Sequence, residues 1–241
     1  FVGEATSAVN GKVYLTGYVD DEGSTRSIYE YDLETKQIKR LSEIVLIANL
    51  SVAGGIVTVE NDEKLPGISL VTIQNNTATG MVDVILYNPQ TNETVIRSGV
   101  TEGYGSGMHL IPLETDPTGR YIYAGSYGNN QIARDDVETG DILIKPGYSH
   151  QTDSLGWYQG ALWMGNYNTG SVTRFDPETY DRTPLYSLMD TVFQQKRMYS
   201  VFGADNKIFC ATVPDTSRIG GSLTWYDMET DLTYVAIGPE P

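Results

Sequence analysis

The sequence predicts an all-β fold made of repeats of one four-stranded antiparallel unit, and three observations support this prediction. A short phrase recurs five times along the 241 residues. A block of residues with a period of two, the pattern of a β-strand, precedes four of the five phrases. No segment has the apolar period of 3.6 residues that indicates a helix.

The recurring phrase reads YDLETK, YNPQTN, DDVETG, FDPETY and YDMETD, and it starts at Tyr31, Tyr87, Asp135, Phe175 and Tyr226. The spacings are 56, 48, 40 and 51 residues, and a period of about 40 to 50 residues is typical of four-stranded propeller blades or helical arrays. An Asx side chain that begins a tight turn can accept a hydrogen bond from the backbone two residues on. The second residues of the phrases are therefore predicted to begin the turn between third and fourth strands: Asp32, Asn88, Asp136, Asp176 and Asp227.

The block upstream of four phrases reads KVYLTGYV, YIYAGSYG, ALWMGNYN and KIFCATVP. Each copy has an aliphatic residue, then an aromatic one, then a small residue two positions further on. The aromatic positions are Tyr14, Tyr123, Trp163 and Phe209. Both faces of these strands are largely apolar, so we expect each sheet to be covered by a neighbouring sheet on either side.

Five such sheets without helices predict one β-propeller domain over residues 1–241, with blades at about 1–42, 43–100, 101–147, 148–190 and 191–241. The sequence leaves open whether the five blades close into a ring or belong to a larger propeller. The segment EKLPGISLVTIQNNTATG, residues 63–80, is expected to form an extra hairpin between the second and third strands of the second blade.

Composition excludes some partners. The net charge is −15 and the isoelectric point is about 4.4, which disfavours nucleic acids and anionic membrane surfaces. The single cysteine, Cys210, excludes a disulfide within this chain. The most apolar window, residues 44–59, is interrupted by polar residues and glycines, and it reads as two strands and a turn rather than a membrane span.

The repeats resemble those of secreted bacterial β-propeller proteins whose blades carry GxxYxG followed by YDPxTG, a group that includes YVTN-type and streptogramin-lyase-like propellers. The stretch QQKRMYSVFGADNKIFCATVPDTSRIGGSLTWYDMET is similar to blades of large uncharacterised surface proteins of Gram-positive bacteria. The resemblance covers the whole chain and implies a secreted or cell-surface location, frequent work on polysaccharides, and further blades or domains in a larger parent chain.

In a propeller, the residues that open each innermost strand lie around the mouth of the central channel, together with the loops between second and third strands. On this rim we expect a site that binds a glycan or a protein. The predicted ligand-binding residues are Glu4, Asn49, His109, Tyr127, Asn129, His150, Gln151, Asp153, Tyr167, Asn168, Arg197 and Arg218. Tyrosines can stack on sugars while amides and carboxylates bind hydroxyls, but for Tyr127 and Tyr167 packing between blades is the favoured interpretation.

Two enzymatic alternatives use the same rim. A polysaccharide lyase acting by β-elimination on uronic-acid polymers needs a general base and a cation. The candidates are His109 or His150 with Tyr104 or Tyr148, plus Arg197. A hydrolase would need a carboxylate pair, for which Glu4 and Asp153 are candidates. A third alternative is a structural scaffold segment without a ligand.

No cofactor is expected. Ca²⁺ is the ion best suited to the acidic loops, at Asp20, Asp21 and Glu22 or at Asp135 and Asp136. Neither group has the spacing of a calcium-binding loop, so a solvated loop or turn is the favoured interpretation.

Overall fold

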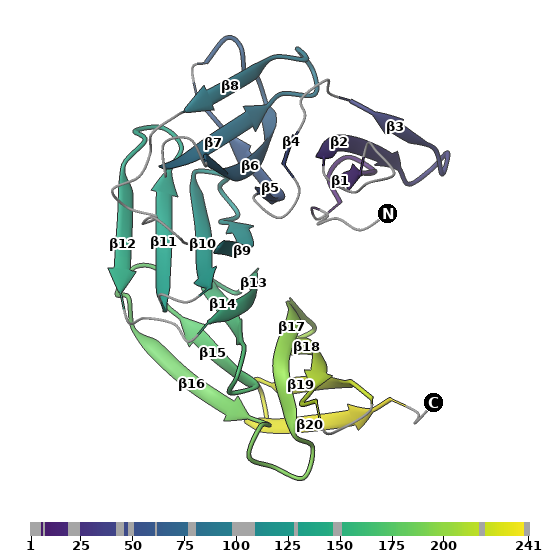
Figure 1. Cartoon of the computed structure of the whole chain (residues 1–241), viewed down its shortest axis with the longest axis vertical. Coiled ribbons are helices and arrows are strands. Elements are labelled where there is room, and N and C mark those ends of the chain that lie inside the picture. Colours follow the sequence, from purple (N-terminus) through teal and green to yellow (C-terminus); the bar gives the residue numbers. More distant parts are fainter. Residues whose placement is uncertain are drawn as a thin grey trace. The chain divides into compact units, whose positions relative to one another are not determined.

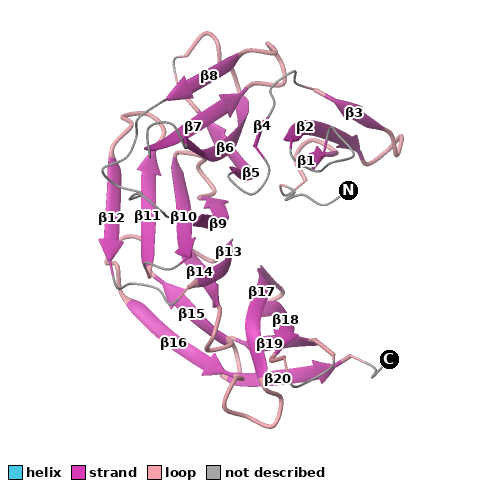
Figure 2. Cartoon of the chain, in the orientation of Figure 1, coloured by secondary structure: helices cyan, strands magenta, loops and turns pink. Residues whose placement is uncertain are grey.

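The structure is a computed structural model, and it describes residues 6, 8–18, 25–41, 46–47, 51–60, 62–76, 81–97, 109–127, 130–146, 151–216 and 220–238. In these residues all regular secondary structure is β-strand (Figure 2). The strands form five four-stranded sheets, which confirms the five predicted blades of a β-propeller. The described part of the chain contains no helix long and apolar enough to span a membrane.

Figure 1 labels the strands in chain order. Blade 1 contains β1 (Lys12–Tyr18), β2 (Thr25–Asp32), β3 (Ile38–Arg40) and β4 (Leu46–Ile47). Blade 2 contains β5 (Ser51–Thr58), β6 (Ile68–Asn76), β7 (Met81–Tyr87) and β8 (Thr94–Arg97). Blade 3 contains β9 (His109–Thr115), β10 (Tyr121–Tyr127), β11 (Gln131–Asp136) and β12 (Ile142–Pro146). Blade 4 contains β13 (Thr152–Tyr158), β14 (Ala161–Asn166), β15 (Ser171–Phe175) and β16 (Arg182–Ser187). Blade 5 contains β17 (Gln195–Ala204), β18 (Lys207–Pro214), β19 (Ser222–Asp227) and β20 (Leu232–Ile237).

In blades 2 to 5 the strands pair in chain order, so the first and fourth strands form the two edges of each sheet. Blade 1 differs, because β4 pairs with β2. The inner strand expected over residues 4–9 lies mostly outside the described residues. Of that stretch, the Thr6 N–H donates to the Tyr14 carbonyl at 2.8 Å.

The predicted turns are present in all five blades. Each Asx side chain accepts hydrogen bonds from the N–H groups two and three residues further on, at 2.8 to 3.4 Å. Because these N–H groups stabilise the carboxylate, they hold the pKa of Asp32, Asp176 and Asp227 below its ordinary value. The recurring phrase is therefore a turn signal.

The prediction for the second blade was wrong in one respect. Residues 68–76 do not belong to an extra hairpin, because Ile68–Asn76 is β6, the second strand of the blade, and pairs with both β5 and β7. The aromatic residue that marks this strand in the other blades is missing. Val71 occupies the equivalent position and is 1% exposed.

Contacts divide the chain into two compact units. Unit 1 contains Phe1–Tyr123 and Ala133–Ile144, and unit 2 contains Ala124–Ile132 and Lys145–Pro241. Each unit is described by itself below. We call the face of a blade that is turned toward the next blade along the chain its forward face, and the opposite face its back face.

In unit 2 the forward face of blade 4 packs against the back face of blade 5. Trp163 is 2% exposed and shares an apolar cluster with Met198 and Cys210. Glycine is required at two positions of this interface, because an added Cβ would lie 2.6 Å from the Val201 carbonyl oxygen at Gly156 and 2.6 Å from the Met198 carbonyl oxygen at Gly165. The two sheets therefore approach each other closely at their inner strands.

Unit 1 repeats this arrangement with other side chains. Tyr14 and Ile28 of blade 1 pack with Leu70, Ile85 and Tyr87 of blade 2. The Tyr87 hydroxyl also donates to the Leu41 carbonyl at 3.1 Å. The aromatic residue of the repeat block, Tyr14 in blade 1 and Trp163 in blade 4, is thus covered by the back face of the next blade.

Candidate ligand-binding site

Side chains from blades 4 and 5 gather where β13 and β17 begin and where β14 and β18 end. We call this group the bulge cluster, and it consists of Gln151, Asp153, Tyr167, Lys196, Arg197, Tyr199 and Asp215. All seven residues belong to unit 2. In an antiparallel sheet the start of the first strand lies beside the end of the second strand, so these segments meet at the same end of each blade.

A buried ion pair anchors the cluster. The Arg197 Nε donates to Asp153 Oδ2 at 2.6 Å, and the side chain of Asp153 is only 1% exposed whereas that of Arg197 is 36% exposed. Gln151 Nε2 lies 3.5 Å from the second carboxylate oxygen. The hydrogen bond to Asp153 raises the pKa of Arg197. The buried carboxylate is thereby paired, as buried charges require.

Tyr167 lies beneath two cations. The Arg197 guanidinium carbon is 4.6 Å from the centre of its ring, and Lys196 Nζ is 5.5 Å away. Both distances are within the range of cation–π attraction. A backbone bridge between Tyr167 and Arg197 joins the end of blade 4 to the start of blade 5. Tyr167 therefore packs between two blades, the alternative that the sequence left open.

Lys196 is paired a second time, with Asp215 at 3.4 Å. The Thr216 N–H, which donates to the Asp215 carboxylate at 2.8 Å, and then Lys196 lower the pKa of Asp215. The cluster thus contains two cations and two carboxylates, each cation having its own partner. Its formal charges cancel although the whole chain carries −15.

Three β-bulges place members of the cluster. The pairing register shifts between Thr152 and Ser154 in β13, and twice in β17, around Lys196 and around Tyr199. A bulge leaves one residue unpaired and redirects its side chain, and bulges are frequent beside functional sites. The unpaired residues are Asp153, Lys196 and Tyr199, and all three belong to the cluster.

Three members of the cluster are not among the predicted ligand-binding residues, Lys196, Asp215 and Tyr199, and the most exposed of them is Tyr199. It is 64% exposed, and its ring centre lies 6.0 Å from the Arg197 guanidinium carbon. The alternation of side chains along β17 does not predict that Tyr199 joins the cluster. Its orientation depends on a bulge, and the bulge arises from the pairing of β17 with β18. Tyr199 is a large aromatic surface next to an anchored polar cluster.

The predicted rim residues fall into three groups. Gln151, Asp153, Tyr167 and Arg197 come together in the cluster, and the exposed Asn168 follows Tyr167 with a positive φ of 66°. His109 and Tyr127 lie at the start of β9 and the end of β10, the equivalent ends of blade 3, with only their backbone described. The remaining predicted residues lie outside the described residues: Glu4, Asn49, Tyr104, Asn129, Tyr148, His150 and Arg218.

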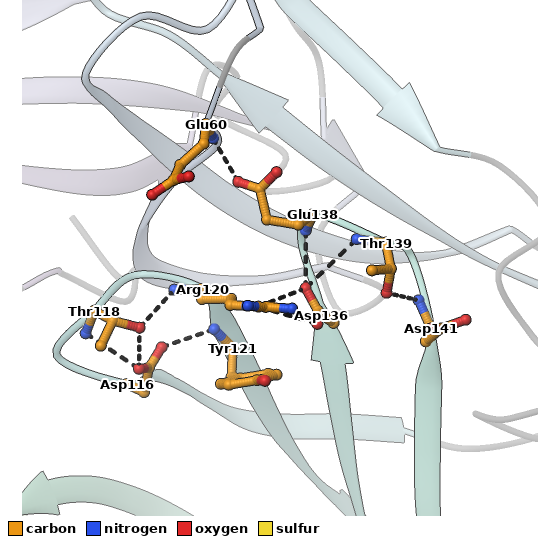
Figure 3. A network of polar contacts seen from close by, with 9 residues as sticks. All are labelled: Glu60, Asp116, Thr118, Arg120, Tyr121, Asp136, Glu138, Thr139 and Asp141. Carbon is orange, nitrogen blue, oxygen red and sulfur yellow. Dashed lines mark hydrogen bonds and ion pairs between the residues drawn. The ribbon is translucent and has the colours of Figure 1, made fainter.

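The described residues contain no group of three or more His, Cys, Asp or Glu side chains that could hold a metal ion. Asp136 is bound by Arg120 through two nitrogens, with Nη2 at 2.8 Å, and also receives the N–H groups of Glu138 and Thr139 (Figure 3). These donors, Arg120 foremost, lower the pKa of Asp136. Asp20, Asp21 and Glu22 lie outside the described residues.

Asp116 accepts hydrogen bonds in the turn between β9 and β10, which belongs to the same network. It accepts the Tyr121 N–H at 2.7 Å and the Thr118 N–H at 3.1 Å (Figure 3). Its carboxylate is therefore used to hold the β9–β10 turn of blade 3, as that of Asp136 holds the β11–β12 turn.

Asp135 has a different environment from its neighbour. It is 1% exposed, and its Oδ1 has no hydrogen-bond partner in the described structure. Burial raises its pKa to about 6, and the nearby Arg97 opposes this rise. Asp135 occupies the position where the other blades have Tyr31, Tyr87, Phe175 and Tyr226. A carboxyl group thus replaces an aromatic ring inside an interface.

Comparisons with known proteins identify the fold alone. No protein-family model matches the sequence, and no curated protein matches it. Solved structures do match. A nidogen/laminin complex gives a TM-score of 0.61 at 12% identity over 97% of this chain and 78% of that chain. TolB from Acinetobacter baumannii gives 0.64 at 14% identity over 100% of this chain and 54% of that chain.

A protein of unknown function from Bacteroides caccae gives a TM-score of 0.63 at 9% identity over 94% of this chain and 77% of that chain. The chain spans little more than half the length of TolB and 60% of that of Sqt1 from Saccharomyces cerevisiae. These similarities support the propeller class. They do not support membership of the narrower group of YVTN-type surface proteins that the repeats resemble.

Proposed function

We propose that this protein is a non-catalytic binding module that takes a glycan at the bulge cluster. The observation that carries the proposal is Tyr199, 64% exposed beside the fixed Arg197–Asp153 pair. The apolar face of a sugar stacks on an aromatic ring, and its hydroxyls bind amides and charged groups at the edge. Gln151, Arg197 and Asp215 supply such groups within the same cluster.

The cluster is held in position without a ligand. The ion pairs fix Arg197 and Lys196, and the backbone bridge at Tyr167 joins the two blades. Fixed side chains lose little conformational entropy on binding, which favours affinity. Tyr199 then provides the stacking surface, because the ring of Tyr167 already lies beneath two cations.

Charge pairing favours a neutral glycan over a uronic-acid polymer. A lyase needs a cation that is available to neutralise the carboxylate of the substrate, whereas Arg197 is hydrogen-bonded to the buried Asp153. Asp153 is likewise engaged and poorly suited to hydrolysis with a second carboxylate. The repeats that resemble secreted bacterial proteins support a role at the cell surface.

A protein ligand is the second candidate, and one observation favours it. One solved structure with this fold is that of a nidogen/laminin complex, and this likeness to a chain of a protein complex is what favours a protein ligand. The proposed glycan site and a protein site would both use Tyr199, because exposed tyrosines contribute strongly to either kind of interface.

A glycan array probed with the whole chain tests the proposal. We expect retention of neutral oligosaccharides, and a loss of affinity of about tenfold in Tyr199→Ala. The control is Tyr234→Ala, which removes another exposed tyrosine of blade 5 outside the cluster. Ultraviolet absorbance on pectic and glycosaminoglycan substrates is followed in parallel, and growth of the unsaturated-uronate band would overturn the non-catalytic assignment.

Two other results would also overturn the glycan assignment. Binding that Tyr199→Ala leaves unchanged would place the ligand elsewhere. An array without signal, together with a protein ligand whose capture is lost in Tyr199→Ala, would identify the cluster as a protein site.

A further inference from the structure

The forward face of blade 5 carries a row of four aromatic side chains, one from each strand. Phe202, Phe209, Trp225 and Tyr234 lie opposite one another in register across β17 to β20. Successive ring centres are 5.2, 6.4 and 5.2 Å apart. We call these four residues the aromatic row.

This face is exposed to an unusual degree. Phe202 is 51% exposed and Tyr234 is 39% exposed, and the same face also presents Leu223 at 44% and Val213 at 40%. The charged residues at its edge, Lys207 and Asp227, pair with each other at 3.5 Å. A contiguous apolar surface of this kind marks an interaction site.

The geometry of the row favours a protein surface over a sugar as its occupant. Phe202 stacks on Phe209 at an interplanar angle of 14°, and Trp225 stacks on Tyr234 at 11°. Rings stacked in this way cover part of each other's flat faces, which a sugar would need for stacking. Their edges and the adjacent aliphatic side chains fit an apolar β-sheet.

The repeat itself shows which kind of sheet this is. Phe209 occupies the position of Trp163 in blade 4 and of Tyr14 in blade 1, which are 2% and 5% exposed. In blade 4 this residue is covered by the back face of blade 5, and in blade 1 by the back face of blade 2. The forward face of blade 5 is the same surface without such a cover in unit 2.

We infer that one more blade of this repeat, connected to the chain after β20, packs with its back face on the aromatic row. The chain path supports this occupant. Residues 188–194 lead from the end of β16 to the start of β17, and so from the edge of blade 4 to its forward face. A connection of that kind after Ile237 would deliver a further inner strand to the forward face of blade 5.

The row also specifies what the additional blade must look like. Blade 4 has Gly156 where blade 5 has Phe202, since Gly156 pairs with Trp163 as Phe202 pairs with Phe209. In blade 4 the Val201 backbone of the next blade lies where a Cβ on Gly156 would be. In blade 5 the corresponding space is filled by the side chain of Phe202. The additional blade therefore needs small residues on its inner strand opposite Phe202.

The inference is tested by extending the whole chain. A second copy of residues 188–237 is placed after Ile237, and the receiving blade carries Phe202→Gly so that it matches blade 4. The copy carries Phe202→Ser, Val213→Ser, Leu223→Ser and Tyr234→Ser, so that its own forward face does not expose a second apolar surface and its β18 and β19 differ in mass from those of the receiving blade. The copied back face contains Met198 and Cys210, which already pack against blade 4. The matched control is the same extension with Ile208→Asp in the copy, because Ile208 is fully buried on the back face.

Two measurements report on coverage of the row. Binding of the dye ANS detects exposed apolar surface, and amide hydrogen exchange reports protection of β18 and β19. We expect the extension to lower ANS fluorescence on the order of twofold and to slow exchange in these strands, and the control extension to leave both unchanged. Far-UV circular dichroism verifies that each extended chain folds.

Three results would overturn the inference. One is an extension that changes ANS binding and exchange no more than its Ile208→Asp control. Another is an unextended chain that sediments as a dimer and becomes monomeric in Phe202→Ser, because a second copy would then be the occupant. The third is an unextended monomer whose ANS binding is unaffected by Phe202→Ser with Leu223→Ser, because the row would then already be covered.

Discussion

The interface between blades 4 and 5 and the interface between blades 2 and 3 both pack a forward face against a back face, but their chemistry differs. In the first, Trp163 is buried among apolar side chains, and the Tyr186 hydroxyl lies 2.9 Å from that of Thr224. In the second, Asp135 is buried at an aromatic position, and one of its oxygens lacks a hydrogen-bond partner in the described structure. A buried nitrogen of Arg97, on the facing blade, also lacks one there.

The difference shows that the blade repeat tolerates a charged group where apolar packing is the rule. Burial of an ionised carboxyl group opposes folding unless its charge is paired and its hydrogen bonds are satisfied. The raised pKa of Asp135 expresses this opposition, and Arg97 compensates only part of it. We expect the blade 2–blade 3 interface to weaken as the pH rises through the range in which Asp135 ionises. The apolar cluster of the blade 4–blade 5 interface contains no carboxyl group, so its contribution should not change over that range.

The largest effect is expected from removing the aromatic residue of the apolar interface. Trp163→Ala leaves a cavity between Met198 and Cys210 and should lower the free energy of unfolding by about 3–5 kcal/mol. Trp225→Ala on the half-exposed forward face should cost less. Urea unfolding followed by far-UV circular dichroism measures both, and equal losses would contradict the comparison.

The next effect concerns Asp135 and has the opposite sign. An acid whose pKa is about 6 when folded and about 3.9 when unfolded binds protons more tightly in the native state, so stability falls as the pH rises from 4 to 6 and is level above. Asp135→Asn removes this fall and should raise the free energy of unfolding at pH 7 by up to about 3 kcal/mol.

Urea unfolding at several pH values between 4 and 7 measures this effect. The three tryptophans, Trp157, Trp163 and Trp225, all lie in unit 2, so circular dichroism or hydrogen exchange must report on unit 1. An Asp135→Asn variant that retains the wild-type fall between pH 4 and 6 would show that another group causes it.

A smaller effect is expected from the facing cation. Arg97→Met removes the attraction that opposes the raised pKa of Asp135, and Asp136 is the other charged group that acts on it. Stability at pH 7 should fall by about 1–2 kcal/mol, with a further rise in the pKa of Asp135. In an Asp135→Asn background the same substitution should have little effect, and a full effect there would exclude the coupling.

The smallest effects are expected at the turns. Asp176→Ala removes two hydrogen bonds to N–H groups at 2.9 and 3.1 Å and should cost about 1 kcal/mol. Asp136→Ala also removes the contact with Arg120 and should cost more, although Arg120 is half exposed. Thermal unfolding of the two variants compares them, and an equal cost would show that the Arg120 contact adds nothing.

Much of the architecture was readable in the sequence because it is encoded locally. An Asx residue that accepts N–H groups two and three positions on needs only its own turn, so the five phrases predicted five turns and five blades. Period-two apolar residues indicated the strands in the same way. The one wrong element, β6, lacks the aromatic residue that marks its counterparts, and Val71 stands in its place.

The candidate site was predictable only in part. The repeat places the starts of the first strands at one end of the blades, and for this reason Gln151, Asp153 and Arg197 were predicted to lie near one another. It could not reveal Tyr199, because a bulge exists only in the register between β17 and β18.

The sequence by itself determined the repeat, the five blades of residues 1–241 and the turn chemistry, all of which depend on residues a few positions apart. Tertiary structure decided the pairing of Arg197 with Asp153, the burial of Asp135 and the exposure of the aromatic row. These features depend on which side chains of one sheet meet the next sheet. Residues about forty or more positions apart meet there through packing and strand register, which no local pattern records.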